Sequence, residues 1–266
     1  MSSFRLSFTR GLKWLFCGTG TQQFFRIIVL VDQKVIRHGD LENHSPRLFG
    51  VSLYQQKNLE LPPEGRKPFN ARALFTTENF LHPSIPYLSP VPCSWGAIYF
   101  PEHWKEFHAY LSARRPESSQ KIGKAVVPNV RSNRWTKSWK KYFIELAYLR
   151  GYVMLYPNYP DFVSLSTNHL EVGSHVKVRT KEKQELFLLP LMELSTASTR
   201  SSTVSLLDLP RNRLPSWDTL PVLNLTGSIT SLEALAAAGQ SRRTELTGCT
   251  NTPAMYNAHD LLCIEG

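Results

Sequence analysis

The chain has 266 residues, of which 42% are hydrophobic, and its formal net charge at pH 7 is +10. This length allows one large domain or two small ones, and the hydrophobic content excludes a wholly disordered chain. The positive charge points to an anionic partner: nucleic acid, a membrane surface or a phosphate-bearing small molecule.

The first 31 residues contain no acidic side chain and carry Arg5, Arg10, Lys13 and Arg26. This composition is similar to that of a mitochondrial transit peptide. The alternative is an atypical start of a longer protein. The run from Phe24 to Val31 predicts a buried strand, and it is far shorter than the roughly 20 apolar residues of a transmembrane helix.

Hydrophobic periodicity predicts further elements in the middle of the chain. Residues 48–54 should form a second strand, and residues 57–92, which hold seven prolines, a long surface loop with one short helix over 70–75. A third strand is expected over 94–100. Pro101 then opens a helix over 102–114, because proline suits the first helical turn.

The clearest helix covers 137–150, and a strand over 152–156 follows it. Its apolar stripe consists of Trp139, Tyr142, Phe143, Leu146 and Leu149, and Gly151 stands where a C-terminal cap belongs. Beyond Leu191, the Ser/Thr-rich run 195–205 has the composition of a flexible linker. A short strand over 222–225 and a short helix over 231–238 are expected, followed by a weakly packed tail.

The cysteines exclude a cysteine-rich zinc site and a dense disulfide scaffold, because they are far apart and form no CxxC pair. One disulfide in an oxidising compartment stays open, and the sequence does not choose the pair among Cys17, Cys93, Cys249 and Cys263. Two N-x-S/T sequons, beginning at Asn43 and Asn224, mildly favour a secretory lumen.

A basic segment from Arg114 to Lys141 contains nine Lys and Arg side chains and one acid, Glu117. One interpretation is a solvated basic face. The other is a group of cations that stabilises a diphosphate leaving group. Nucleic acid is not expected as a partner, because no RNP, zinc-finger or helix-turn-helix pattern accompanies the charge.

Four motifs carry the strongest functional signal. They read PCSWGAIYFPEHW (92–104), VPNVRSNRWTKSW (127–139), YVMLYPNY (152–159) and STNHLEVGSH (166–175). With the residues around them, they resemble a fungal family, with plant relatives, of glycosyltransferase family 2-like proteins in the nucleotide-diphospho-sugar transferase superfamily. The likeness is close over 45–191 and weaker over 214–226 and near the C-terminus.

The resemblance implies an α/β fold of the type-A glycosyltransferases: a mixed sheet flanked by helices, with long loops. It divides the chain into an atypical segment (1–44), an acceptor-side domain (45–191), a linker (192–213) and a C-terminal extension (214–266). Because only 44 residues precede the matching region, much of the nucleotide-binding half should be missing. The resemblance also implies the lumen of the Golgi or endoplasmic reticulum, and a mitochondrial or cytosolic location is the alternative.

In such folds a Trp-Gly strand end lines the sugar and acceptor cleft, which implies substrate-binding roles for Ser94, Trp95 and Gly96. Glycine allows close approach of a ligand to the backbone, and an aromatic face can stack on a sugar ring. A core tryptophan beside a packing glycine is the alternative. Arg131, Arg134 and the neighbouring Trp135 are candidates to contact diphosphate or acceptor, since arginine grips phosphate with two donors.

Type-A enzymes hold Mn²⁺ or Mg²⁺ with an Asp-x-Asp motif and a later histidine, and the cation neutralises the diphosphate. This sequence contains no Asp-x-Asp. The candidate ligands are Asp32, at the end of an apolar strand, and His169. Glu145 and Glu171 are candidates for the carboxylate that deprotonates the acceptor hydroxyl. The alternative for Glu145, which lies nearly opposite the apolar stripe of its helix, is a solvated charge.

The expected function is therefore transfer of a sugar from a nucleotide-diphosphate donor to a hydroxyl acceptor such as a glycan. The missing Asp-x-Asp predicts weak binding of nucleotide diphosphate and metal. The alternative is a non-catalytic basic module that binds anionic partners.

Overall fold

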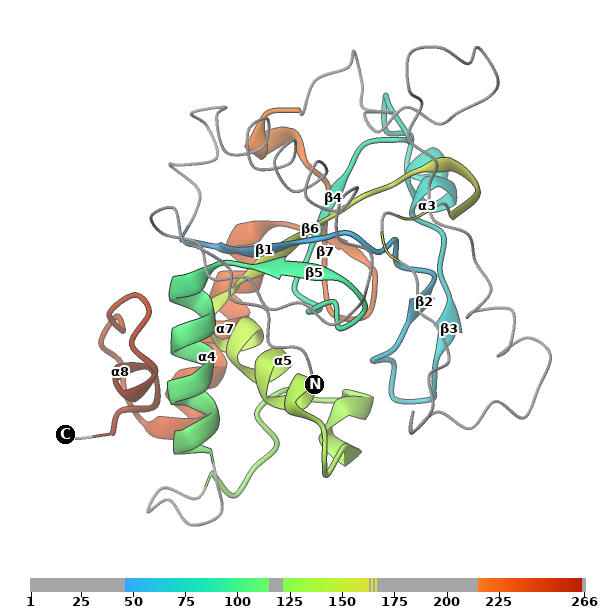
Figure 1. Cartoon of the computed structure of the whole chain (residues 1–266). Coiled ribbons are helices and arrows are strands. Elements are labelled where there is room, and N and C mark those ends of the chain that lie inside the picture. Colours follow the sequence, from blue (N-terminus) through green and yellow to red (C-terminus); the bar gives the residue numbers. More distant parts are fainter. Residues whose placement is uncertain (1–45, 115–121, 163, 165, 167–214, 265–266) are drawn as a thin grey trace, which may run out of the picture.

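The computed structural model describes residues 46–114, 122–162, 164, 166 and 215–264 (Figure 1). These residues form an α/β fold with a six-stranded mixed sheet and a separate two-stranded hairpin. The large sheet consists of β1 (Leu48–Ser52), β4 (Tyr87–Ser89), β5 (Ala97–Tyr99), β6 (Val153–Tyr156), β7 (Val222–Leu223) and β8 (Ile229–Thr230). The hairpin consists of β2 (Asn58–Leu59) and β3 (Lys67–Pro68). The helices are α3 (Ala71–Thr77), α4 (Pro101–Ala113), α5 (Trp139–Arg150), α7 (Leu232–Thr247) and α8 (Ala258–Leu262), with short 3₁₀ turns at η1 (Arg131–Arg134), η2 (Pro160–Phe162) and η4 (Trp217–Thr219).

The strand order of the large sheet is β5-β1-β6-β4-β7-β8. Strands β1 and β6 run parallel, as do β4 and β7, and the other pairs are antiparallel. Every residue of β1 and of β6 is buried, which explains their continuous apolar sequences. This mixed sheet with flanking helices confirms the expected fold class, and it places the carboxyl ends of β1 and β6 at one edge.

Helices α4 and α5 confirm the two predicted long helices. Pro101 occupies the first turn of α4, with Glu102 beside it. Helix α5 ends at Gly151, whose φ of 64° is the left-handed cap conformation that glycine adopts without strain. In Figure 1 these helices lie together on one side of the sheet, where α5 packs against both α4 and α7. The apolar stripe of α5 is buried at Phe143, while Trp139 at the start of the helix is 39% exposed.

The proline-rich stretch 57–92 differs from the single long loop expected for it. The short helix is present as α3, and the Asn70 side chain caps it by accepting from the Ala73 amide at 3.1 Å. The stretch also contains β2, β3 and β4, and β4 lies inside the large sheet, paired with β6 and β7. These strands have two or three residues each, too few for an alternating pattern. Strands β2 and β3 pair with each other, and β4 is defined by its pairing with the distant strands β6 and β7.

The C-terminal extension is more ordered than the expected weakly packed tail. Helix α7 has 16 residues and begins at a capping serine, Ser231, whereas a helix ending at 238 was expected. Strands β7 and β8 join the large sheet, and Leu261 and Leu262 of α8 are buried in the same core. Gly239 explains the close crossing of α7 over α5, because a Cβ at this position would lie 2.3 Å from the Tyr148 carbonyl oxygen.

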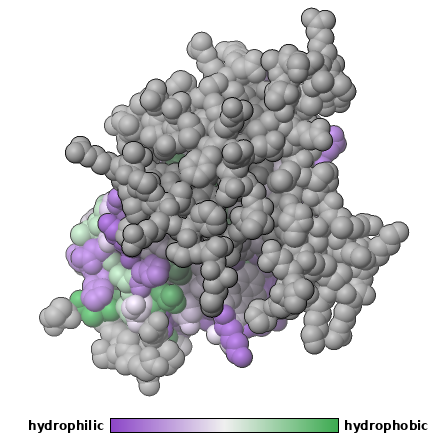
Figure 2. All heavy atoms as spheres, viewed as in Figure 1, coloured by the Kyte–Doolittle hydropathy of each residue, from purple (hydrophilic) through white to green (hydrophobic). Residues whose placement is uncertain are grey.

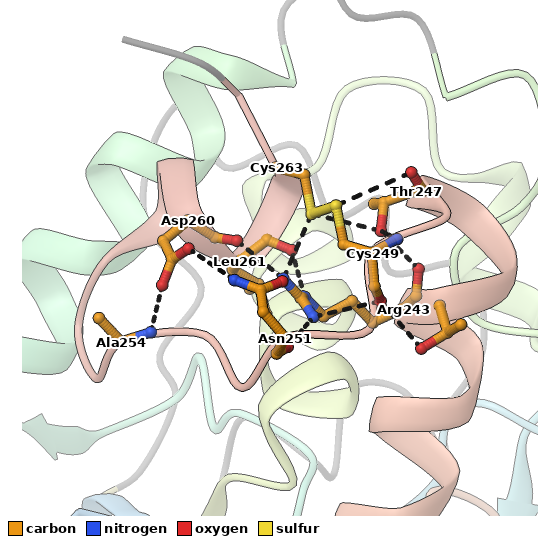
Figure 3. The surroundings of a disulfide bond; sticks show 9 residues. Arg243, Thr247, Cys249, Asn251, Ala254, Asp260, Leu261 and Cys263 are labelled. Carbon is orange, nitrogen blue, oxygen red and sulfur yellow. Dashed lines mark hydrogen bonds between the residues drawn. A yellow bond between two sulfur atoms is a disulfide. The ribbon is translucent and has the colours of Figure 1, made fainter.

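A disulfide joins Cys249 and Cys263 beyond the end of α7 (Figure 3). The guanidinium of Arg243 lies beside it and donates to the backbone oxygens of Asn251, Asp260 and Leu261. The Cys249–Cys263 bond is one of the pairings that the sequence left open. Cys93 is a buried free thiol.

Hydrophilic and hydrophobic residues lie side by side where described residues are visible in Figure 2. Among the described residues, the exposed large hydrophobic side chains are Leu81, Trp139, Ile229 and Met255. Among the described helices, none combines the length and apolar character needed to cross a bilayer.

Candidate functional site

Three chain segments meet at the carboxyl ends of the parallel strands β1 and β6. Residues 53–55 continue β1, and residues 158–159 follow β6. Trp95 and Gly96 precede β5, whose first residue, Ala97, pairs with Ser52 at the end of β1. Ligands of open α/β sheets bind outside the carboxyl ends of the strands. We call Tyr54, Trp95, Gly96 and Ser166 at this edge the aromatic corner.

The two rings of the aromatic corner pack edge to face. Their centroids are 5.0 Å apart at 72°, with Trp95 half-buried and Tyr54 buried. Ser94, beside them, is exposed. The hydroxyl of Tyr54 is buried and has no hydrogen-bond partner among the described residues, and burial raises its pKa. The corner therefore offers a partly accessible tryptophan that packs on the ring of Tyr54, whose hydroxyl is buried.

Gly96 makes room for the protein's own chain. Its φ is 120°, and a Cβ there would lie 2.4 Å from the Ser166 hydroxyl oxygen. That hydroxyl donates to the Trp95 carbonyl oxygen at 2.9 Å, and the Leu53 amide donates to the Gly96 carbonyl oxygen at 2.8 Å. The expected reason for glycine was close approach of a ligand, but Ser166 occupies this space.

Gln55 connects the end of β1 to the segment after β6. The side-chain nitrogen of Gln55 donates to the Tyr159 carbonyl oxygen at 2.9 Å, and its side-chain oxygen accepts from the Tyr159 backbone N–H at 2.6 Å. The backbone amide of Gln55 also donates to the Ser164 hydroxyl at 3.0 Å. These bonds hold the edges of the corner in place across more than 100 residues of sequence.

A second group of polar residues lies between the β2–β3 hairpin and the start of α5. The Glu60 carboxylate accepts from Lys140 at 2.8 Å and lies 3.9 Å from the Arg66 guanidinium. Arg131 donates to the Glu60 carbonyl oxygen at 3.5 Å. Burial alone would raise the pKa of Glu60, but Lys140, Arg66 and Arg131 together hold it below its usual value. We call these four residues the Glu60 cluster.

The predicted phosphate-binding arginines contact backbone oxygens of the hairpin. Arg131 also donates its backbone amide to the Leu61 carbonyl oxygen, and the exposed Arg134 donates to the Pro63 carbonyl oxygen at 2.7 Å. Trp135, at the end of η1, is partly buried against the core. These contacts do not use all the N–H donors of either guanidinium. The predicted role of both arginines in ligand binding therefore stays a prediction.

Cys93 lies between the aromatic corner and the Glu60 cluster. Its sulfur accepts from the Trp95 amide at 3.4 Å and lies 3.7 Å from the Gly96 carbonyl oxygen. Burial raises the pKa of this thiol, and the charges of Lys140 and Glu60 also reach it. Cys93 thus contacts the aromatic corner and is close enough to the Glu60 cluster to sense its charges. A raised pKa keeps the side chain a thiol, which is less reactive than a thiolate.

Glu145 is buried between α4 and α5, not solvated on the outer face of its helix. It is 2% exposed, and one carboxylate oxygen accepts from the Tyr110 hydroxyl at 3.0 Å and from Arg114 Nε at 3.1 Å. The periodicity of α5 does not reveal this burial. The cation and the hydroxyl that make a buried carboxylate tolerable come from another part of the chain, Arg114 and Tyr110. Its predicted catalytic role stays untested.

The remaining predicted site residues, Asp32, His169 and Glu171, lie outside the described residues. Within 46–114, 122–162 and 215–264, no group of three or more His, Cys, Asp or Glu side chains is arranged to hold a metal ion. The described part therefore supplies no such donor set for Mn²⁺ or Mg²⁺.

A hollow of about 340 Å³ opens elsewhere, between residues 122–124 and the end of α7. None of its lining residues belongs to the aromatic corner or the Glu60 cluster. Its charged groups, Lys124 and Glu245, pair with each other at 3.4 Å.

Comparison with family models, with curated proteins and with solved structures finds no match for this chain.

Proposed function

We propose that the chain takes part in sugar transfer from a nucleotide-diphosphate donor and binds the hydroxyl acceptor at the aromatic corner. The observation that carries the proposal is the half-buried Trp95, which packs on the ring of Tyr54 at the carboxyl ends of β1 and β6. The buried Tyr54 hydroxyl makes no hydrogen bond to any described residue. The motif that resembles the glycosyltransferases, residues 92–104, contributes Trp95 to this edge.

The chemistry of a sugar suits these groups. A pyranose ring presents C–H groups on one face, which pack on an aromatic ring, and hydroxyls at its rim. An unpaired buried hydroxyl costs roughly 1–3 kcal/mol, and a sugar hydroxyl that reaches Tyr54 would remove this cost. Ser94, exposed beside Trp95, is a further donor and acceptor for the rim. These groups would hold an acceptor, whereas the described residues fix no catalytic carboxylate.

Saturation-transfer NMR with a panel of neutral oligosaccharides tests the proposal on the full chain. We expect transfer to at least one member, lost in Trp95→Ala and weakened in Tyr54→Phe. Trp139→Ala is the matched control, because Trp139 is exposed on α5, outside the corner. Binding that survives Trp95→Ala, or no binding to any member, contradicts the proposal. Release of UDP or GDP from nucleotide sugars, with and without Mn²⁺, then tests transfer.

A second candidate function, binding of an anionic ligand without catalysis, is favoured by the Glu60 cluster. Three cations surround one carboxylate there, and Lys140 is only 8% exposed. Lys140 and Lys141 also stand in the first turn of α5, which contains no acid. A helix N-terminus already attracts negative charge, so cations in its first turn strengthen the attraction for an anion.

Calorimetry with inorganic pyrophosphate tests this second candidate. We expect binding that weakens with salt and falls about tenfold in Arg66→Ala or Arg131→Ala, the equivalent of one charged contact of about 1.4 kcal/mol. Lys105→Ala is the control, because Lys105 is an exposed cation on α4. Equal losses in all three variants would mean that only net charge matters, which contradicts a built site.

A further inference from the structure

The turn between β7 and β8 carries the sequence Asn224-Leu225-Thr226, an acceptor pattern for N-glycosylation. The side-chain oxygen of Asn224 accepts from the Thr226 amide at 2.9 Å, the Thr226 hydroxyl at 2.9 Å and the Ser228 amide at 3.0 Å. The oxygen is thus fully engaged, and the side-chain nitrogen makes no hydrogen bond within the described part of the chain.

The turn lies at an accessible place. Thr226 and Ser228 are exposed and Asn224 is half-exposed, while Leu225 between them is buried and anchors the turn. Gly227 has φ 86°, which allows the chain to reverse toward β8. Strand β8 is the edge of the large sheet, so no further strand of the described fold lies beyond it.

The disulfide is an independent observation that points to the same compartment. Cys249 and Cys263 are joined beyond α7, in the segment that also carries β7 and β8 (Figure 3). Disulfides form and persist in oxidising environments such as the lumen of the endoplasmic reticulum. Attachment of glycans to asparagine in secreted proteins takes place on the same route.

We propose that Asn224 is an N-glycosylation site and that the chain enters the secretory lumen. The co-substrate is a lipid-diphosphate-linked oligosaccharide, delivered by the transferase of the host cell. The Asn224 side-chain nitrogen attacks the anomeric carbon, a C–N bond forms, and the C–O bond to the lipid diphosphate breaks. The lipid diphosphate leaves with the electron pair, and the nitrogen loses one proton to a base of the transferase.

This modification goes beyond the sugar-transfer proposal, because here the chain is the acceptor of a glycan. A glycan at Asn224 would stand at the end of the edge hairpin. Edge strands present unpaired backbone groups on which other chains can add, and bulky polar cover blocks that pairing. The glycan would therefore also keep β8 from pairing between molecules.

The test is expression of the full chain in a eukaryotic cell, followed by treatment with peptide N-glycosidase. We expect a mobility shift that the enzyme removes, with conversion of Asn224 to aspartate detected by mass spectrometry in isotope-labelled water. Thr226→Ser should keep the glycan, while Thr226→Ala and Asn224→Asp should lose it. Asn224→Asp is the matched control for folding, because its carboxylate can accept the same three hydrogen bonds.

Asn43→Gln in the background of each variant separates the other sequon from this one. A shift that persists in Asn224→Asp with Asn43→Gln overturns the assignment to Asn224. A full chain that carries no glycan at Asn224 overturns the proposal, whether the reason is location or access. Neither result bears on carbohydrate binding by Trp95, so failure of the two proposals is distinguishable.

Discussion

Arg243 is 1% exposed, and its guanidinium donates to the backbone oxygens of Asn251, Asp260 and Leu261. Glu106 is equally buried, with Arg150 on one carboxylate oxygen and the Tyr152 hydroxyl on the other. Buried charges are tolerated only when they are paired and hydrogen-bonded. At the scale of single residues, these two buried charges of the described part thus hold together backbone segments and elements that pack on one another.

Gly96→Ala should destabilise the protein by about 3 kcal/mol, because positive φ strains an L-residue and the new Cβ collides with Ser166. Chemical denaturation measures the change. Gly65→Ala is the control: Gly65 also has positive φ, 143°, but nothing lies within 4 Å of its Cβ position. Equal losses of stability in the two variants would mean that Ser166 moves away from the new Cβ, so that the collision costs nothing. Ser166→Gly should rescue part of the Gly96→Ala loss and none of the Gly65→Ala loss.

His103 should make the protein acid-sensitive. Burial lowers its pKa to about 4, although the Pro46 carbonyl oxygen, 3.1 Å from Nε2, and Glu102 act in the opposite direction. The positive charge of Arg150 lowers the pKa of His103 further, and the rings of Tyr152 and Tyr256 pack on the imidazole. The unfolded chain binds a proton near pH 6.5 and the folded chain only near pH 4.

The free energy of unfolding should therefore fall as the pH drops from 7 to 4, by up to about 1.4 kcal/mol per pH unit from this residue. Urea unfolding at several pH values measures the slope. The slope should be smaller in His103→Gln and unchanged in His108→Gln, because His108 is exposed. An identical slope in His103→Gln would show that other groups cause the acid sensitivity.

At the scale of elements, α5 is the centre of the helical layer. It contacts α4 on one side and α7 on the other. Toward α4 the interface combines stacked rings, Phe107 on Phe143 at 4.5 Å, with a buried polar group of Glu145, Tyr110 and Arg114. Toward α7 it is a close backbone crossing that Gly239 permits. Specific pairing toward α4 and close approach toward α7 together determine how both neighbours sit on the sheet.

Glu145→Gln should destabilise the protein by about 3 kcal/mol, because it leaves the 13%-exposed side chain of Arg114 without its carboxylate. Thermal and urea unfolding measure the change. The double variant Glu145→Leu with Arg114→Leu should lose less stability than either single variant, since no orphan charge is buried. If Glu145 instead serves catalysis, Glu145→Gln would lower sugar transfer while leaving the stability unchanged.

At the scale of the whole molecule, the C-terminal extension completes the fold. Strand β7 pairs with β4 in the middle of the sequence, and α7 covers α5. Leu223, Leu261 and Leu262 are buried in the same core as β1 and β6. The boundary at residue 214 therefore separates regions of different sequence character that share one hydrophobic core.

Deletion of residues 215–266 should abolish cooperative folding, because it uncovers α5 and the free edge of β4. The full chain should show a single melting transition by calorimetry, and the truncated chain should bind a hydrophobic dye and sediment as aggregate. A control deletion of residues 265–266 should leave the melting temperature unchanged. A cooperative melt of the truncated chain would contradict the shared core.

Local sequence signals determined the long elements, and the resemblance to glycosyltransferases implied the α/β class of fold that the structure shows. Pro101 and Gly151 mark ends of α4 and α5, and the apolar runs of β1 and β6 signal buried strands, because caps and periodicity are local properties. Trp95 and Gly96 were found as a motif, and the structure places them at the edge where α/β sheets bind ligands.

Tertiary structure decided what depends on partners distant in the sequence. Strands of two or three residues, such as β4 and β7, exist because distant strands supply their hydrogen bonds. Burial of Glu145 follows from the position of Arg114 on another helix, and the need for glycine at 96 follows from Ser166. No local pattern encodes such contacts, because the free energy of a buried charge or a close approach depends on the group opposite it.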